Sequence, residues 1–186
     1  MHKHLKCLFV FTVVLTVIAC KENVIPKPSA QLRLEYERAL FIPLESECPF
    51  GFDYNSETRL TIKEECNLVI NYPKMKASVF VTYKKIDENL ESLLRDAQKL
   101  TYEHVIKADD IIEQPFINPR DKVYGMFYQV GGNAATNAQF YATDSTKHFI
   151  TGSMYFYAKP NFDSILPAAH YLKNDIQLMM ETLYWK

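Results

Sequence analysis

The sequence predicts an α+β fold, a single layered domain in which two long helices pack on a mainly antiparallel sheet. Two segments, 87–108 and 163–184, carry apolar residues at helical spacing. Runs that alternate apolar and polar residues, which are typical of strands, precede the first segment and lie between the two. A chain of 186 residues can build one hydrophobic core, so we expect one domain.

The residues before the first helix read as strands and turns. Residues 31–36 alternate apolar and charged side chains, which indicates a half-buried strand. Residues 41–44 extend or follow it, and Pro43 restricts them to a sheet edge because proline donates no ladder hydrogen bond. Residues 73–76 form a basic turn, and 77–86 form a further strand.

We expect a β-hairpin between these strands. Its strands are 48–54 and 60–72, and the polar cluster 55–58 is its turn. One residue, Glu64, interrupts the apolar face of the second strand.

Two cysteines, Cys48 and Cys66, lie in this hairpin. If Tyr54 pairs with Leu60 across the turn, the two cysteines face each other, with Cβ atoms about 4.5 Å apart, near the range for a disulfide. An exported protein folds in an oxidising compartment, so we expect the bridge. Two buried free thiols are the alternative.

The first helix, 87–108, can be capped by Asp87 or Asn89 and ends at Asp109 and Asp110. Its inner stripe comprises Leu90, Leu93, Leu94, Ala97, Leu100, His104 and Ala108. The last helix, 163–184, has Pro167 in its first turn, where a missing donor matters least. Its stripe comprises Ile165, Ala168, Leu172, Ile176, Met179 and Leu183.

Between the helices we expect a short strand at 111–116 and further strands at 122–130, 139–143 and 147–157, with 131–135 as a loop. The last strand is largely apolar on both faces, which predicts that both faces are covered.

Residues 1–19 are typical of a lipoprotein signal peptide. A basic start precedes an uncharged, mostly apolar run that is shorter than the roughly 20 residues of a spanning helix. The run ends in Val17-Ile18-Ala19-Cys20, the pattern that a lipoprotein signal peptidase cuts once Cys20 carries a diacylglycerol. A plain secretory signal with an accidental cysteine is the alternative.

We therefore expect residues 20–30 to be a lipidated tether and 31–186 to be one globular domain. Two or three acyl chains, palmitate among them, would hold the chain on a membrane of the cell envelope. Lys21 after the cysteine favours the outer membrane, and we expect its periplasmic face rather than the cell surface. The formal net charge of −1 argues against a nucleic-acid partner.

We predict no catalytic residue, no metal site and no cofactor. His104, His148 and His170 lack paired-ligand spacing, and Ser153 lacks the second glycine of a nucleophile elbow. The acidic residues at 109, 110 and 113 lack the alternating oxygen ligands and central glycine of a calcium loop.

The loop Gly131-Gly132-Asn133 is a candidate ligand or docking site, because paired glycines permit close backbone approach. A hairpin loop is the plainer interpretation. A pocket there, joined by Tyr128 and His148, would suit a ligand-binding or hydrolytic protein. An exposed platform for glycan or protein is a further alternative, built from Tyr102, Tyr124, Tyr128, Tyr141, Tyr155 and Tyr157.

The predicted order of strands, helix, strands and helix is similar to that of PsbP/Mog1 domains, a likeness of fold alone. Several runs closely resemble the GldD family, gliding-motility lipoproteins of Bacteroidetes. They are residues 72–77, 94–104, 123–128, 131–134 and 171–175, with the ending Trp185-Lys186. The resemblance implies a cell-envelope component of gliding associated with type IX secretion, and it places Cys48 and Cys66 at family positions.

We therefore predict a non-enzymatic accessory lipoprotein, anchored through Cys20, whose partners are the membrane and other envelope proteins of gliding and secretion. The alternative is an envelope ligand- or glycan-binding protein, or a weak hydrolase, with a pocket near residues 131–133.

Overall fold

The computed structural model describes residues 34–103, 108–157 and 162–186. They belong to a compact unit that extends from Gln31 to Lys186. Its main element is a seven-stranded sheet in which every neighbouring pair is antiparallel. In spatial order the strands are β4 (Arg59–Ile62), β5 (Leu68–Tyr72), β6 (Ala77–Lys85), β10 (His148–Phe156), β9 (Ala138–Thr143), β8 (Val123–Gly132) and β7 (Ala108–Asn118).

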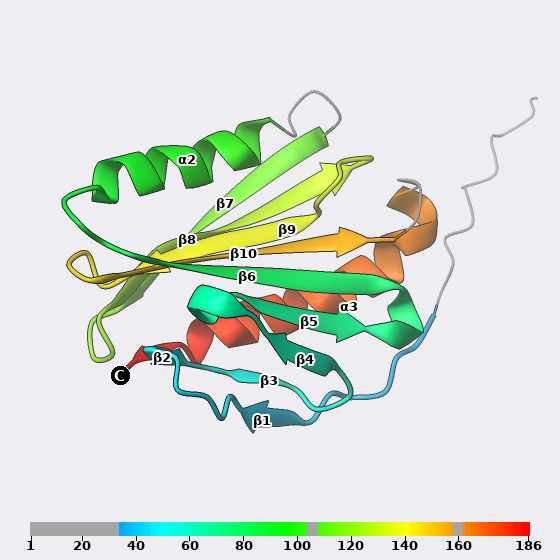
Figure 1. The fold of residues 1–186 in the computed structure, drawn as a ribbon. Helices are drawn as coiled ribbons and strands as arrows, with labels where there is room; N and C mark the ends of the chain where they lie inside the picture. Colours follow the sequence, from blue (N-terminus) through cyan, green and yellow to red (C-terminus); the bar gives the residue numbers. More distant parts are fainter. Residues whose placement is uncertain (1–33, 104–107, 158–161) are drawn as a thin grey trace, which may run out of the picture. The chain divides into compact units, whose positions relative to one another are not determined.

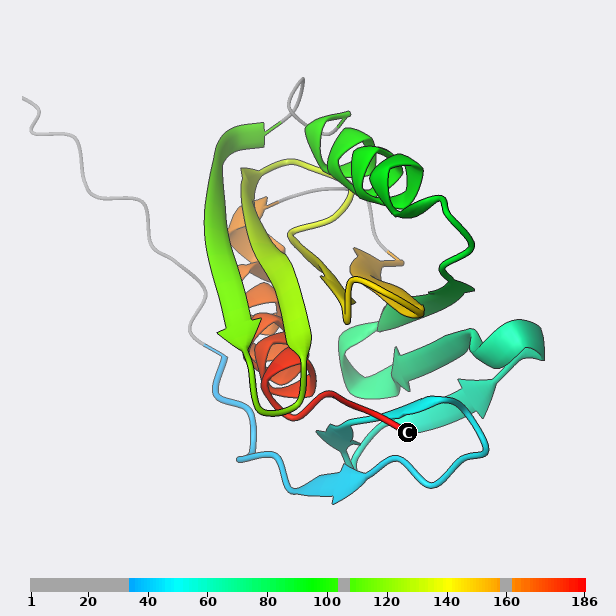
Figure 2. The same ribbon diagram turned by 90° about the vertical axis from the view of Figure 1, so that its left-hand side faces the viewer.

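Two helices cover the sheet, α2 (Leu90–Tyr102) and α3 (Phe162–Glu181). Side chains alternate between the two faces of strand β9, and this alternation shows that α2 and α3 lie on opposite faces of the sheet. Gln139 hydrogen-bonds Thr101 of α2, whereas its neighbour Phe140 points into the core cluster that contains Leu172 and Ile176 of α3. Figures 1 and 2 show the two helices on either side of the strands. The predicted α+β fold with two helices on an antiparallel sheet is confirmed.

A second, smaller β layer lies against α3 (Figure 1). It consists of two two-stranded sheets, β1 (Phe41–Pro43) with β3 (Asp53–Asn55), and β2 (Phe50–Gly51) with β11 (Tyr184–Trp185). The backbone N–H of Asp53 donates to Thr182 Oγ1 at 2.9 Å, which fixes this layer to the end of α3. The core between the layers includes Phe50 and Phe52, which are 0 % and 1 % exposed.

The predicted hairpin between 48–54 and 60–72 is wrong. Residues 60–72 are two strands, β4 and β5, that pair with each other across the 3₁₀ turn η1 (Glu64–Cys66). Glu65 and Cys66 take positive φ values of 54° and 57°, and Lys63 N–H donates to the Asn67 carbonyl at 2.7 Å, which closes the turn. Glu64, which broke the apolar pattern, is exposed in this turn.

The strands on the N-terminal side of the hairpin pair elsewhere. Residues 48–54 are split between β2 and β3, whose partners are β11 and β1. The edge strand predicted at 41–44 is confirmed as β1. In the predicted strand 31–36, residues 34–36 have no regular secondary structure and Leu34 is 48 % exposed, whereas residues 31–33 lie outside the described part.

The first helix is shorter than predicted. It spans Leu90–Tyr102 and buries Ala97 and Thr101, whereas Leu100 is 39 % exposed. Asp109 and Asp110 do not end a helix, because they lie in β7 with Ala108. Strand β7 forms a long hydrogen-bond ladder with β8. Pro115 is tolerated within β7 because this strand is at the sheet edge. His104 lies outside the described residues.

The remaining predicted elements are found with small shifts. The predicted turn at 73–76 is η2 (Pro73–Met75), and the strands 77–86, 111–116, 122–130, 139–143 and 147–157 correspond to β6, β7, β8, β9 and β10. Gly131 and Gly132 end β8 rather than belonging to a loop, whereas Asn133 lies beyond the strand. The last helix buries most of its predicted stripe, and Pro167 lies in its second turn.

Replacing Gly125 by alanine should destabilise the domain. An added Cβ would overlap the carbonyl oxygen of Tyr141, and would lie 2.9 Å from Met180 Cε and 3.0 Å from Ala142 Cα. Overpacking of this kind costs about 1–3 kcal/mol, because the backbone of β9 cannot move independently of its neighbours. Urea unfolding would measure the loss. An unchanged midpoint would contradict the close approach of β8 and β9.

Candidate functional site

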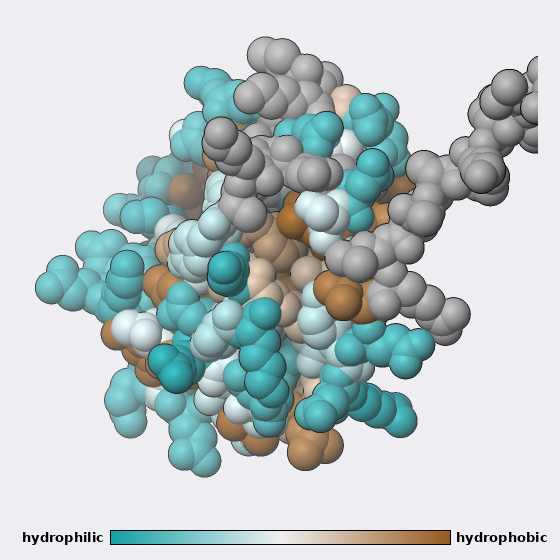
Figure 3. All heavy atoms as spheres, turned by 90° about the vertical axis from the view of Figure 1, so that its right-hand side faces the viewer, coloured by the Kyte–Doolittle hydropathy of each residue, from teal (hydrophilic) through white to brown (hydrophobic). Residues whose placement is uncertain are grey.

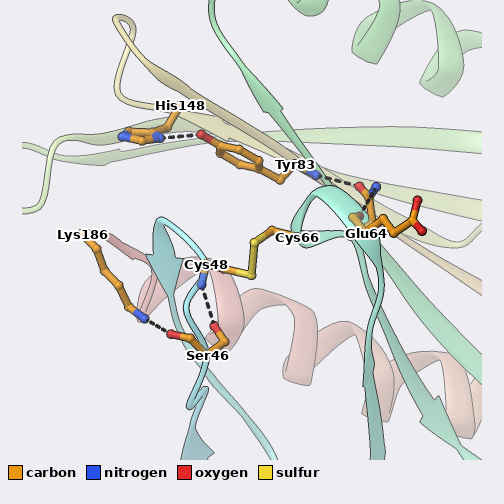
Figure 4. The surroundings of a disulfide bond; sticks show 8 residues. Ser46, Cys48, Glu64, Cys66, Tyr83, His148 and Lys186 are labelled. Carbon is orange, nitrogen blue, oxygen red and sulfur yellow. Dashed lines mark hydrogen bonds between the residues drawn. A yellow bond between two sulfur atoms is a disulfide. The ribbon is translucent and has the colours of Figure 1, made fainter.

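Cys48 and Cys66 are joined by a disulfide, although not across the predicted hairpin (Figure 4). Cys48 precedes β2 and is 2 % exposed, and Cys66 ends the turn η1 of the main sheet. Their Cα atoms are 5.6 Å apart. The bridge therefore ties the edge of the seven-stranded sheet to the second β layer. Cys20, the predicted lipidation site, lies outside the described residues.

His148 lies in the surroundings of this disulfide (Figure 4), and it does not line the cavity that contains Gly131. Its Nδ1 is 2.9 Å from the hydroxyl of Tyr83, and its ring stacks on Trp185 with centroids 5.2 Å apart. Trp185 in turn donates from Nε1 to the Lys122 carbonyl at 3.0 Å. These contacts position the C-terminal strand β11 and do not join His148 to a pocket at Gly131.

Gly131 does line a cavity of about 210 Å³. Its other walls include Asp110 of β7 and four residues of α3, which are Leu166, Ala169, His170 and Lys173. Lys173 Nζ donates to Gln129 Oε1 at 3.0 Å. Gly132 takes a φ of 82°, which only glycine adopts without strain, so this end of β8 depends on Gly132. Neither Tyr128 nor Asn133 lines this cavity.

A second cavity, of about 240 Å³, was not foreseen from the sequence. We call it the Tyr36 pocket. It lies where residues 35–37, the turn after β5 and α3 meet, at the side of the domain that Figure 3 presents. Figure 3 shows a mostly hydrophilic face with apolar residues exposed between the polar ones. The lining residues are Glu35, Tyr36, Glu37, Asn55, Glu57, Tyr72, Pro73, Lys74, Met75 and Tyr171.

A buried carboxylate adjoins the Tyr36 pocket. Asp175 is only 2 % exposed, and its Oδ2 accepts hydrogen bonds from Asn55 Nδ2 at 2.8 Å and from the Tyr72 hydroxyl at 3.0 Å. Asn55 Nδ2 also donates to the Tyr171 hydroxyl at 3.0 Å. The cluster therefore fastens β3 and β5 to α3.

Burial raises the pKa of Asp175, although its hydrogen bonds from Asn55 and Tyr72 oppose the shift. Burial and the neighbouring carboxylate raise the pKa of Tyr72 well above its usual value. The hydroxyl of Tyr72 therefore stays protonated and donates to Asp175 over the physiological range. This arrangement holds three elements together rather than activating a nucleophile.

The lining of the Tyr36 pocket has more acidic than basic residues. Glu35, Glu37 and Glu57 line the pocket, with Lys74 as the one basic lining residue. Lys74 Nζ lies 3.0 Å from Glu57 Oε2, and this contact raises the pKa of Lys74. With three carboxylates and one ammonium group, the pocket lining carries a formal net negative charge.

The other predicted candidates are dispersed. Asp110 lines the Gly131 cavity, whereas Glu113 accepts a hydrogen bond from the Tyr102 hydroxyl. Ser153 is a buried strand residue of β10. In the described ranges, no group of three or more His, Cys, Asp or Glu residues could hold a metal ion. No helix of those ranges is long and apolar enough to cross a membrane.

The predicted tyrosine platform is mostly covered. Tyr128 is 2 % exposed, and Tyr124, Tyr141 and Tyr155 are half-buried. Burial raises the pKa of Tyr141 and Tyr155. Tyr102 and Tyr157 are exposed, at 49 % and 62 %. The tyrosines therefore serve mainly as packing residues of the sheet.

No curated protein matches the chain. The family model described as gliding motility lipoprotein GldD matches residues 21–185, which is nearly the whole sequence after Cys20. The match includes both cavities, the disulfide and the Asp175 cluster. The chain therefore belongs to the gliding motility lipoprotein GldD family.

Proposed function

We propose that this protein is a non-enzymatic accessory component of the gliding machinery and the associated type IX secretion apparatus. Lipid on Cys20 fastens it to the outer membrane, on the periplasmic face. One observation carries the proposal: the family match begins at Lys21, directly after the predicted lipidated cysteine. The family domain is then the part that the anchor holds at the envelope.

The packing supports a role as a docking body. The disulfide, the Asp175 cluster and the contacts of Trp185 connect segments that are far apart in the chain. Asp175 is buried, and its hydrogen bonds from Asn55 and Tyr72 connect β3 and β5 to α3. Such a rigid domain presents a constant surface to other envelope proteins, which we propose are its partners together with the membrane.

Replacing Cys20 by alanine should strongly reduce gliding in a strain that carries only the altered gene. Without the cysteine no diacylglycerol is attached, and the protein is no longer held on the membrane. Colony spreading and secretion would be measured beside a strain that lacks the gene. Cys7→Ala, a change in the predicted signal peptide, is the matched control and should leave gliding normal. Normal spreading with Cys20→Ala would refute the requirement for the anchor.

An envelope ligand-binding protein, of glycan or another small molecule, or a weak hydrolase, is the second candidate. The cavity at Gly131 favours it, because Asp110 and Lys173 place opposite charges among its lining residues. Lys173→Ala should then reduce gliding while the protein keeps its amount and its unfolding temperature. Full gliding by this variant would count against a role for the cavity.

A further inference from the structure

We propose that the Tyr36 pocket receives a lysine or arginine side chain of a partner protein. The inference rests on the proposed docking function, and it names the chemistry of one contact. It is carried by the size of the pocket, by its aromatic walls and by its charge.

The size of the pocket fits one long side chain. Its volume is about 240 Å³. Sites for small molecules usually measure about 300–1,000 Å³, so this pocket lies below that range.

The walls of the pocket suit a cation. Tyr36, Tyr72 and Tyr171 contribute aromatic rings, and Met75 adds a flexible apolar group. The rings of Tyr36 and Tyr171 are tilted by 59° with centroids 5.3 Å apart, so they present differently oriented surfaces. An ammonium or guanidinium group is attracted to the face of an aromatic ring, and its alkyl stem packs on apolar surface.

The charge of the pocket lining favours a ligand of positive charge. Three carboxylates and one ammonium group line it, and the ammonium of Lys74 is already paired with Glu57. Glu37 is exposed, so its attraction for a cation acts partly through water and is screened by salt. A carboxylate ligand would be repelled, and a neutral isostere would gain only the packing.

The walls come from segments far apart in the chain. Tyr72 to Met75 and Tyr171 belong to two of the runs on which the family resemblance rests, and they meet only in the folded domain. Asn55 and the buried Asp175 hold these two segments together. The pocket is therefore preformed, which lowers the entropy lost when a side chain enters it.

Methyl NMR of the chain from Lys21 onward would test the proposal, because that chain contains every described residue. Met75 lines the pocket, whereas Met179 is 1 % exposed and serves as an internal reference. The probes are Nα-acetyl-arginine amide and Nα-acetyl-lysine amide, with the neutral citrulline amide as a matched control. We expect both cations to shift the Met75 signal saturably, with affinities in the millimolar range that weaken at high salt.

Two variants should weaken arginine binding by roughly threefold to tenfold. Glu37→Gln removes a charge and keeps the shape, and Tyr36→Leu removes a ring; both positions are at least partly exposed, so folding should be preserved. Glu88→Gln, an exposed acid outside the pocket lining, should bind as the wild type does. An unmoved Met75 signal, an equal response to citrulline amide, or equal weakening by Glu88→Gln would overturn the proposal.

Phosphatidylethanolamine vesicles provide a further arm. If the vesicles shift the Met75 signal while the two amino acid amides do not, the pocket binds a lipid headgroup and the proposed protein contact is wrong. The gene deletion tests the docking function separately. If the deletion abolishes gliding and Met75 stays unmoved, only the pocket proposal fails. If the deletion strain glides normally, the proposed function fails whatever the NMR result.

Discussion

Replacing Cys48 and Cys66 together by alanine should lower the free energy of unfolding by about 3 kcal/mol. The two cysteines are 18 residues apart in sequence, and a bridge that closes a loop of this length removes about that much chain entropy from the unfolded state. For a domain of this size the loss corresponds to a melting temperature lower by roughly 6–12 °C. Thermal unfolding followed by circular dichroism would measure it.

Reduction supplies the control for this prediction. A thiol reductant should lower the melting temperature of the wild type toward that of the double variant, and should leave the double variant unchanged. Because the bridge joins η1 to the segment before β2, proteolysis of the reduced protein should begin in residues 44–49. Equal melting temperatures of the wild type with and without reductant would show that the disulfide contributes nothing to stability.

Replacing Asp175 by alanine should cost about 2–4 kcal/mol of stability at neutral pH. The change leaves the Tyr72 hydroxyl and the Asn55 amide without their buried acceptor, and it also opens a space beside α3. Asp175→Asn keeps an oxygen that can accept both hydrogen bonds. We therefore expect this variant to be more stable than the alanine variant, by about 1 kcal/mol or more in urea unfolding. Equal losses in the two variants would contradict the role of the hydrogen bonds.

The same pair of proteins gives a pH test. Burial raises the pKa of Asp175 in the folded state, so the folded protein binds a proton more tightly than the unfolded chain does. This group's contribution to stability therefore falls as the pH rises from about 4 toward the raised pKa. The wild type should gain stability relative to Asp175→Asn when the pH is lowered through this window. A difference between the two that does not change with pH would refute the raised pKa.

The apolar periodicity of the sequence predicted an antiparallel sheet and two helices, although the first helix is shorter than the pattern indicated. The stripe from Ala168 to Leu183 predicted the buried face of α3, because burial on one side of a helix requires that spacing. The strands β6, β9 and β10 also follow from their composition. The alternation of apolar and polar residues could not show which strands pair with each other. Residues 50–55 have strand patterning, but their partners β1 and β11 come from near the two ends of the described sequence.

The Tyr36 pocket could not be predicted for the same reason, because its walls come from segments more than 100 residues apart. One local signal was available. Asp175 stands on the apolar stripe of α3 between Leu172 and Met179, where a charged residue must find buried partners. Glu64 was a similar exception, and it marked the turn that separates β4 from β5. Both exceptions to the apolar pattern held structural information.

Strand β7 has a consequence for how copies of the protein behave when they are crowded. It is 11 residues long and forms one edge of the main sheet, where unpaired backbone groups could recruit a strand from a neighbouring molecule. Pro115 removes a donor in the middle of β7, and Asp109, Asp110 and Glu113 add exposed side chains of like charge. Lipid-anchored copies that diffuse in a single plane would thus be hindered from edge-to-edge aggregation, even at high surface density.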